Sequence, residues 1–128
     1  MKQILERIPA SGHPMDVMRC VSSVLGTLEP EDNKERNSVS IAIRLVALFG
    51  PCLLYWHHFH VSGLRIQGFT GPKDTVAENF MKLLLLKLKP SDGAVHPLMI
   101  RTFDQSLILY AEHDFNASTF AARVTAST

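Results

Sequence analysis

The segment Tyr110–Phe120, YAEHDFNASTF, contains the residues whose types and spacing could do chemistry. His113 lies between two carboxylates, Glu112 and Asp114, directly after an apolar helical pattern, and Asn116 is a good N-cap for a following helix. The carboxylates can orient or charge-stabilise the imidazole, and the amide dipoles of a helix N-terminus favour developing negative charge. A histidine donor at such a junction suits the stabilisation of an enolate or an oxyanion. A lone histidine near a helix end can also be purely structural, and both interpretations stay open here.

The other histidines have simpler interpretations. His57 and His60, in the sequence HHFH, are three residues apart and could share a helix face to bind a metal. No cysteine or suitably spaced carboxylate nearby completes the three or four protein ligands of a typical zinc site, so we expect no metal. His13 precedes Pro14 at a predicted helix start, where it could cap the helix or face a cleft, and capping is the simpler role.

The composition is that of a globular protein. Apolar residues make up 46% of the 128 residues and charged residues 20%. With 13 basic and 12 acidic residues the net charge is +1, so neither nucleic acid nor an anionic membrane is expected as the main partner. The apolar run Leu83–Leu86 is far too short to span a bilayer, and no secretory leader opens the chain. Cys20 and Cys52 lie in apolar helical contexts, which predicts buried free thiols, a reducing compartment and a soluble, cytoplasmic protein.

The hydrophobic periodicity predicts an all-α protein with about five helices in a single domain over residues 1–128. Pro14 fits a first helical turn, and Thr75 and Glu78 have capping-box spacing. The predicted helices run from about His13 to Leu28, from Asn37 or Ser38 to Phe59, from Asp74 or Thr75 to just before Pro90, from Leu98 to Glu112, and from Asn116 onward. Because Thr128 falls inside a helical pattern with no closing signal, we expect an excerpt of a longer chain.

The second predicted helix is apolar around nearly its whole circumference, with Arg44 as its only charged residue. A helix of this kind is buried on most sides. In so small a domain, its apolar surface exceeds what four other helices can cover. The sequence therefore also allows a non-catalytic function, as a helical dimerisation module.

Four stretches resemble a known family. The sequence AEHDFNASTFAARVTAST resembles the citrate synthase signature around its first catalytic histidine, and HPMDVMR, followed by LLYWHHF and SGLRI, is most similar to the 2-methylcitrate synthase branch. Four matches in the right order over nearly the whole chain make the resemblance specific. It implies the helical core of the family's large domain, including the helices of the subunit interface, and hence a homodimer.

The resemblance also implies a reaction, the condensation of acetyl- or propionyl-CoA with oxaloacetate. In the family, a carboxylate removes a proton from the carbon beside the thioester, while the histidine that matches His113 donates a hydrogen bond to the thioester oxygen. A second histidine activates the oxaloacetate carbonyl, and hydrolysis of the thioester then releases coenzyme A. Coenzyme A arrives as part of the substrate, so no cofactor is expected.

Other residues bear on this implied activity. Asn79 and Asn116 are candidate substrate-binding residues. Asn79 stands in AENF where many methylcitrate synthases have G-G-H-F, and asparagine there is common among citrate synthases proper, so the acyl preference stays open. The family's G-P-x-H-G-G-A-N-E segment and its later aspartate motif do not occur in these 128 residues, which are therefore expected to be inactive alone.

Overall fold

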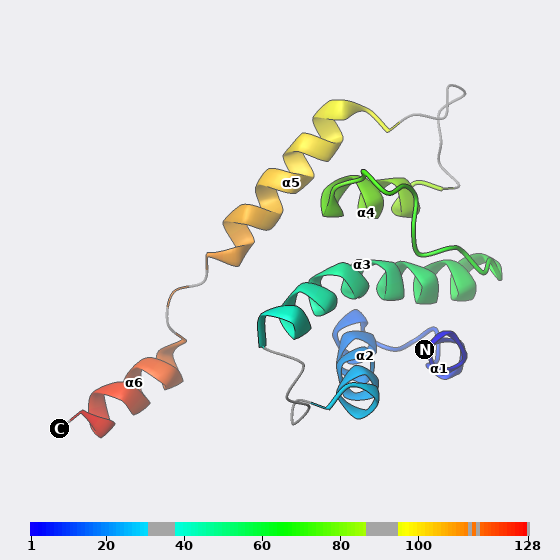
Figure 1. The fold of residues 1–128 in the computed structure, drawn as a ribbon. Coiled ribbons are helices and arrows are strands. Elements are labelled where there is room, and N and C mark those ends of the chain that lie inside the picture. The colour runs from blue at the N-terminus through cyan, green and yellow to red at the C-terminus, as the bar shows by residue number, and fades with distance from the viewer. Residues whose placement is uncertain (31–37, 87–94, 113, 115, 128) are drawn as a thin grey trace. The chain divides into compact units, whose positions relative to one another are not determined.

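The computed structural model describes residues 1–30, 38–86, 95–112, 114 and 116–127. These residues contain six helices and no strand, which confirms the predicted all-α class (Figure 1). The chain divides into two compact units, Met1–Val95 with helices α1 to α4 and His96–Thr128 with α5 and α6. The single domain expected over residues 1–128 stays a prediction.

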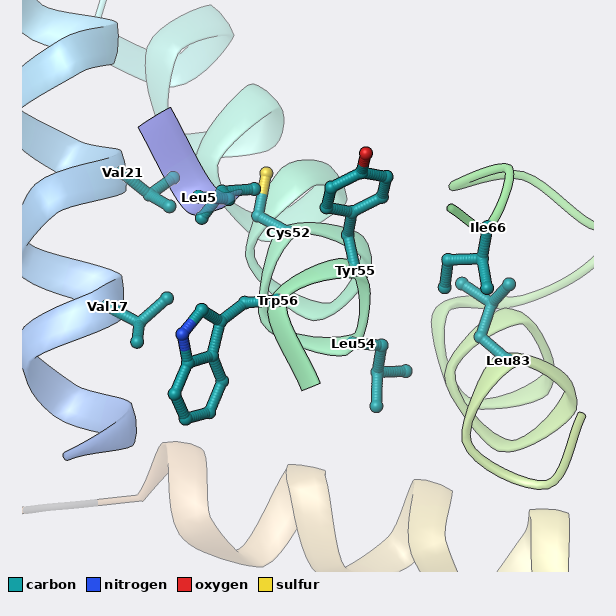
Figure 2. Packing of buried hydrophobic residues seen from close by; sticks show 9 residues of the cluster. All are labelled: Leu5, Val17, Val21, Cys52, Leu54, Tyr55, Trp56, Ile66 and Leu83. Carbon is teal, nitrogen blue, oxygen red and sulfur yellow. The ribbon is translucent and has the colours of Figure 1, made fainter. Parts of the chain in front are cut away.

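In the first unit, α3 (Ser38–Ser62) is the helix against which α1 (Lys2–Arg7), α2 (Pro14–Leu28) and α4 (Val76–Leu84) pack. Figure 2 shows Val17 and Val21 of α2 on one side of α3 and Ile66 and Leu83 on the other. Among the described residues, the main core cluster consists of nine buried apolar side chains, which are Leu5, Val17, Val21, Cys52, Leu54, Tyr55, Trp56, Ile66 and Leu83, and Ala77 and Met81 of α4 are buried as well. Because α3 supplies four of them, all from its C-terminal half, that half organises the unit.

The N-terminal half of α3 is largely uncovered. Val39, Ile43 and Val46 share one face of the helix and are each more than half exposed. The expectation that α3 is buried on most sides therefore holds only for its C-terminal half.

By length and composition, α3 could also cross a membrane. Its most apolar 18-residue window has a mean hydropathy of 1.8, and 17% of that window is buried. This corrects the inference, drawn from Leu83–Leu86, that the chain has no apolar segment of sufficient length. The core helix of a soluble protein can meet the same two criteria, and three other helices pack against α3.

The helix α1 was not predicted from the sequence. It has only six residues, too few to show a helical period, and its N-cap Met1 makes no side-chain capping bond. Tertiary contacts hold it, since Leu5 is 1% exposed and the Nζ of Lys2 lies 5.2 Å from the centre of the Tyr55 ring. Packing, rather than local helix signals, accounts for this element.

Two other helix starts in this unit follow the capping chemistry, whereas Asn37, a predicted start of α3, lies outside the described residues. His13 caps α2 through a bond from the Met15 amide to its Nδ1, as the simpler interpretation expected. Thr75 and Glu78 form the predicted capping box at the start of α4. That helix ends at Leu84, earlier than the sequence suggested, and residues 87–89 of the predicted span lie outside the described residues.

The two cysteines differ in burial, and both are free. Cys52 is buried in the core, where desolvation raises the pKa of its thiol. Cys20 is exposed, so the prediction of two buried thiols is wrong for that residue. The reason is helical geometry, because α2 turns Val17 and Val21 inward and position 20 points about 100° away from position 21.

The second unit contains α5 (Pro97–Ala111) and α6 (Ala117–Ala126). The first residue of each helix lies within one position of the predicted start. Neither helix has a buried residue. Apolar side chains such as Ile108, Leu109 and Tyr110 are mostly exposed.

Candidate functional site

The junction between α5 and α6 holds the residues singled out for chemistry. α5 ends at Ala111, and its C-cap Glu112 is extended, with φ −78° and ψ 111°. Asp114 has a φ of 54°, in the left-handed region that few residues other than glycine, asparagine and aspartate adopt. His113 itself lies outside the described residues, so its catalytic role stays a prediction.

Asn116 closes this junction as the N-cap of α6. Its Oδ1 accepts a hydrogen bond of 2.9 Å from the Ser118 amide, which confirms the predicted cap. Glu112 and Asp114 are exposed, so both carboxylates are available to water or a ligand. The substrate-binding role suggested for Asn116 stays a prediction, and its oxygen already serves the helix.

Asn79 lies on α4, where its side chain fastens the preceding loop. Its Oδ1 accepts a bond of 3.0 Å from the Thr70 amide, and its Nδ2 donates to the Gly68 carbonyl over 3.4 Å. Asn79 therefore holds the turn before α4 in place. Its predicted role toward substrate stays untested, and these internal bonds give it a structural role that the sequence did not reveal.

The same loop contributes Asp74 to a charged pair with Lys82 of α4. Asp74 accepts bonds from the Lys82 ammonium at 2.6 Å and from the Thr70 hydroxyl at 2.5 Å. The Thr70 hydroxyl also lies 2.9 Å from the Asn79 Oδ1. Because the hydroxyl has a single proton to donate, the charged carboxylate of Asp74 is the stronger acceptor for it than the Asn79 amide oxygen. Lys82 first, and then Thr70, hold the pKa of Asp74 below its ordinary value.

A cavity of about 180 Å³ lies between α3 and α4, beside this loop. Its walls are mainly apolar, from Ala47, Gly50, Pro51, Phe69 and Phe80, with Asp74, Thr75, Val76 and Asn79 at the α4 side. The polar groups among these residues are engaged in the bonds described above. The cavity therefore suits a small apolar group better than a charged one.

Two of the histidines near the end of α3 form hydrogen bonds to other helices. The Nε2 of His58 lies 2.7 Å from the Leu83 carbonyl and that of His60 lies 3.4 Å from the Leu5 carbonyl. Because a carbonyl only accepts, each ring must donate its Nε2 proton. In the part of the chain that the structure describes, no group of three histidine, cysteine or acidic residues could hold a metal ion.

A second charged cluster connects α1 to α3 and to the segment after it. Arg65 donates to both carboxylate oxygens of Glu6, at 2.8 and 3.1 Å, and the Tyr55 hydroxyl donates at 2.6 Å. Arg65, followed by Tyr55, lowers the pKa of Glu6 from 4.5 to about 2. These contacts fix α1 on the core and have no evident chemical task.

Two histidine sites escaped the sequence analysis. His96 caps α5, with its Nδ1 accepting from the Leu98 amide at 3.2 Å. The signal was present, because His96 precedes Pro97 just as His13 precedes Pro14. The bond from His58 to Leu83 had no local signal, since its partner lies 25 residues along the chain.

Comparison with known proteins gives this arrangement a context. A family profile described as "Citrate synthase, C-terminal domain" matches residues 1–128. The chain is 48% identical to a 2-methylcitrate synthase of Shewanella oneidensis over 128 residues, which are the whole of this chain and 32% of that protein.

Two further relatives show the same pattern. Identity is 38% to 2-methylcitrate synthase 2 of Corynebacterium glutamicum, over 98% of this chain and 32% of that protein. It is 35% to a citrate synthase of Mycolicibacterium smegmatis, over 100% of this chain and 32% of that protein. The chain thus spans about a third of the length of the curated relatives it matches.

Proposed function

The chain belongs to the citrate synthase family, and we propose that it forms part of an enzyme that condenses an acyl-CoA with oxaloacetate. The observation that carries the proposal is the 48% identity to a 2-methylcitrate synthase along the whole chain. The local geometry supports it, because α5 and α6 are separated by a short connection from residue 112 to residue 116 that includes position 113.

In this proposal, His113 acts on the acyl-CoA. A carboxylate from elsewhere in the enzyme removes a proton from the carbon beside the thioester carbonyl. The imidazole of His113 donates its proton through a hydrogen bond to the thioester oxygen, so that the enol forms without a free enolate charge. The enol carbon then bonds to the ketone carbon of oxaloacetate while the enol proton returns to His113, and the ketone oxygen takes up a proton from a second histidine elsewhere in the enzyme. Water cleaves the thioester and releases coenzyme A, so the reaction uses no further cofactor.

The flanking residues support such a donor. The N-terminus of α6 presents amides with partial positive charge, which favours negative charge on the substrate oxygen. The exposed carboxylates of Glu112 and Asp114 offer acceptors that can select one tautomer of a neighbouring imidazole. Removal of one such donor typically costs about 2.7–4 kcal/mol in transition-state stabilisation.

We propose propionyl-CoA as the preferred substrate, with acetyl-CoA as the alternative. The support is the greater identity to the Shewanella 2-methylcitrate synthase, 48%, than to the Mycolicibacterium citrate synthase, 35%. The product would be 2-methylcitrate in the first case and citrate in the second.

A chimaera tests the proposal. Residues 1–128 replace the matching third of the Shewanella 2-methylcitrate synthase, and thiol release is followed with oxaloacetate and either propionyl- or acetyl-CoA. We expect thiol release that depends on oxaloacetate and is faster with propionyl-CoA, whereas the 128-residue chain alone releases none. A folded chimaera without activity, or turnover by the 128 residues alone, would contradict the assignment.

A second function is favoured by one observation, the exposed apolar face of α3 formed by Val39, Ile43 and Val46. An exposed apolar face of this kind is typical of an interaction surface, and we propose that a second copy of the protein covers it. This role is compatible with catalysis, or could be the sole role of the chain. Light scattering after size-exclusion chromatography decides, since a stable monomer at micromolar concentration would contradict dimerisation.

A further inference from the structure

Two helices, one in each unit, begin with the same histidine cap. His13 has φ −72° and ψ 139°, and His96 has φ −60° and ψ 130°. In each case Nδ1 accepts from the amide two residues on, that of Met15 at 3.1 Å and that of Leu98 at 3.2 Å. The two caps are therefore nearly superimposable pieces of local structure.

The following proline explains why the two sites agree. Proline at the first helical position has no amide to satisfy, and it disfavours a helical conformation at the residue before it. Each histidine is therefore kept extended, with its ring over the next free amide. The cap follows from the His-Pro pair and needs no tertiary contact.

A histidine cap differs from other caps in one respect. The Nδ1 atom accepts a hydrogen bond only while it carries no proton, and a charged imidazole has two donors and no acceptor. Protonation also places a positive charge at the positive end of the helix dipole. Histidine is the side chain that ordinarily changes charge between pH 5 and 8.

We propose that the His-Pro caps form an acid-sensitive device, in which protonation of His96 and of His13 releases the first turns of α5 and α2. The caps of α4 and α6 lack this sensitivity, because Thr75 and Asn116 accept through a hydroxyl and an amide oxygen. The proposal rests on the cap geometry and is independent of the function proposed above.

The two caps differ in what else holds their helices. α2 has Asp16 in its first turn and buries Val17 and Val21, so charge and packing both resist fraying at His13. α5 has no acidic residue in its first turn and no buried residue. His96 is thus the more sensitive of the two caps.

Within the described residues, no hydrogen bond or ion pair joins a charged side chain to His13 or His96. Asp16 is paired with Arg19 on its own helix. The charged residues on the two capped helices and on α1 and α3 are Lys2, Glu6, Arg7, Asp16, Arg19, Arg44, Arg101 and Asp104. Of these, Glu6 is paired with Arg65 and Arg44 with Glu29. His58 and His60 face the carbonyls of Leu83 and Leu5.

Amide hydrogen exchange of the full chain, followed by NMR at pH 8 and pH 5.5 and corrected for intrinsic rates, tests the device. We expect the protection of the Leu98 amide to fall about fivefold at the lower pH, the usual size of a lost cap, and that of Met15 to fall less. The amides of Ser118 and Glu78 serve as internal references and stay unchanged.

Two variants separate the cap from other effects of acid. His96→Asn supplies an acceptor that does not titrate, so Leu98 should remain protected at both pH values, whereas His96→Ala should leave it unprotected at both. The same two substitutions at His13 should change the protection of the Met15 amide alone. The proposal would be overturned if the protection of the Leu98 amide did not change with pH in the unaltered chain. It would also be overturned if this protection fell equally in His96→Asn.

Discussion

Both units of the chain are built from helices within the described residues, yet they hold their structure in different ways. In Met1–Val95, three helices pack against α3, and five of the described apolar residues are less than 2% exposed. In His96–Thr128, no described residue of α5 or α6 is buried, and the helix starts rest on local caps. The comparison teaches that the unit with the candidate chemistry is the one with the least packing of its own.

The largest effect should come from removing a core side chain in the first unit. Leu83→Ala removes a side chain that is 1% exposed and should destabilise the unit by about 2–5 kcal/mol. The matched change Leu109→Ala, at a residue 74% exposed on α5, should cost less than about 0.5 kcal/mol. Denaturant unfolding measures both, and equal costs would break the comparison between the two units.

Two glycines within helices of the first unit should respond differently to alanine. A Cβ at Gly26 meets nothing within 4 Å, so Gly26→Ala should stabilise α2 by about 0.5–1 kcal/mol. A Cβ at Gly50 would lie 3.0 Å from the Phe80 ring, so Gly50→Ala should gain less or destabilise. Thermal unfolding ranks the two variants, and a more stable Gly50→Ala would show that α3 and α4 pack loosely there.

The loss of a cap should spread further in the first unit than in the second. Asn116→Ala should cost α6 about 1 kcal/mol and reduce helical circular dichroism while leaving the tertiary signal of Trp56 unchanged. Thr75→Ala removes the matching cap of α4, which packs on α3, and should lower the midpoint of that tertiary signal. A shift of the midpoint by Asn116→Ala would show that the units unfold together.

The smallest effect concerns Glu6, whose bonds to Arg65 and Tyr55 hold α1. Because the folded state lowers its pKa from 4.5 to about 2, the stabilisation is complete above pH 4.5 and is lost as the pH falls toward 2. Glu6→Gln cannot make this charged contact. The stability difference between wild type and Glu6→Gln should therefore be largest at neutral pH and vanish near pH 2, and a difference that grew with acid would have the wrong sign.

Much of this structure could be predicted where the signal is local. The caps at His13, Thr75 and Asn116 follow from the side chain and the residues next to it, so the starts of α2, α4 and α6 were found. Helix α1 was missed because six residues carry no period. A helix apolar on all sides, such as α3, does not reveal which half its neighbours will cover.

The site shows the same division. The junction around Asp114 could be recognised because its residues are contiguous in the sequence. The bonds of Asn79 to Thr70 and Gly68 depend on how the loop folds back on α4, and the bond from His58 depends on how α4 packs on α3. Neither contact leaves a pattern in the sequence, so Asn79 was interpreted only through resemblance.

The central claim is that the imidazole at position 113 acts on the thioester. Thiol release by the chimaera with the Shewanella enzyme, carrying either His113→Gln or the control His57→Gln, tests it most directly. We expect His113→Gln to lower kcat by about 10²–10⁴-fold, and His57→Gln, at an exposed position on α3, to stay within a factor of about two. A folded His113→Gln chimaera that keeps its kcat would contradict the claim.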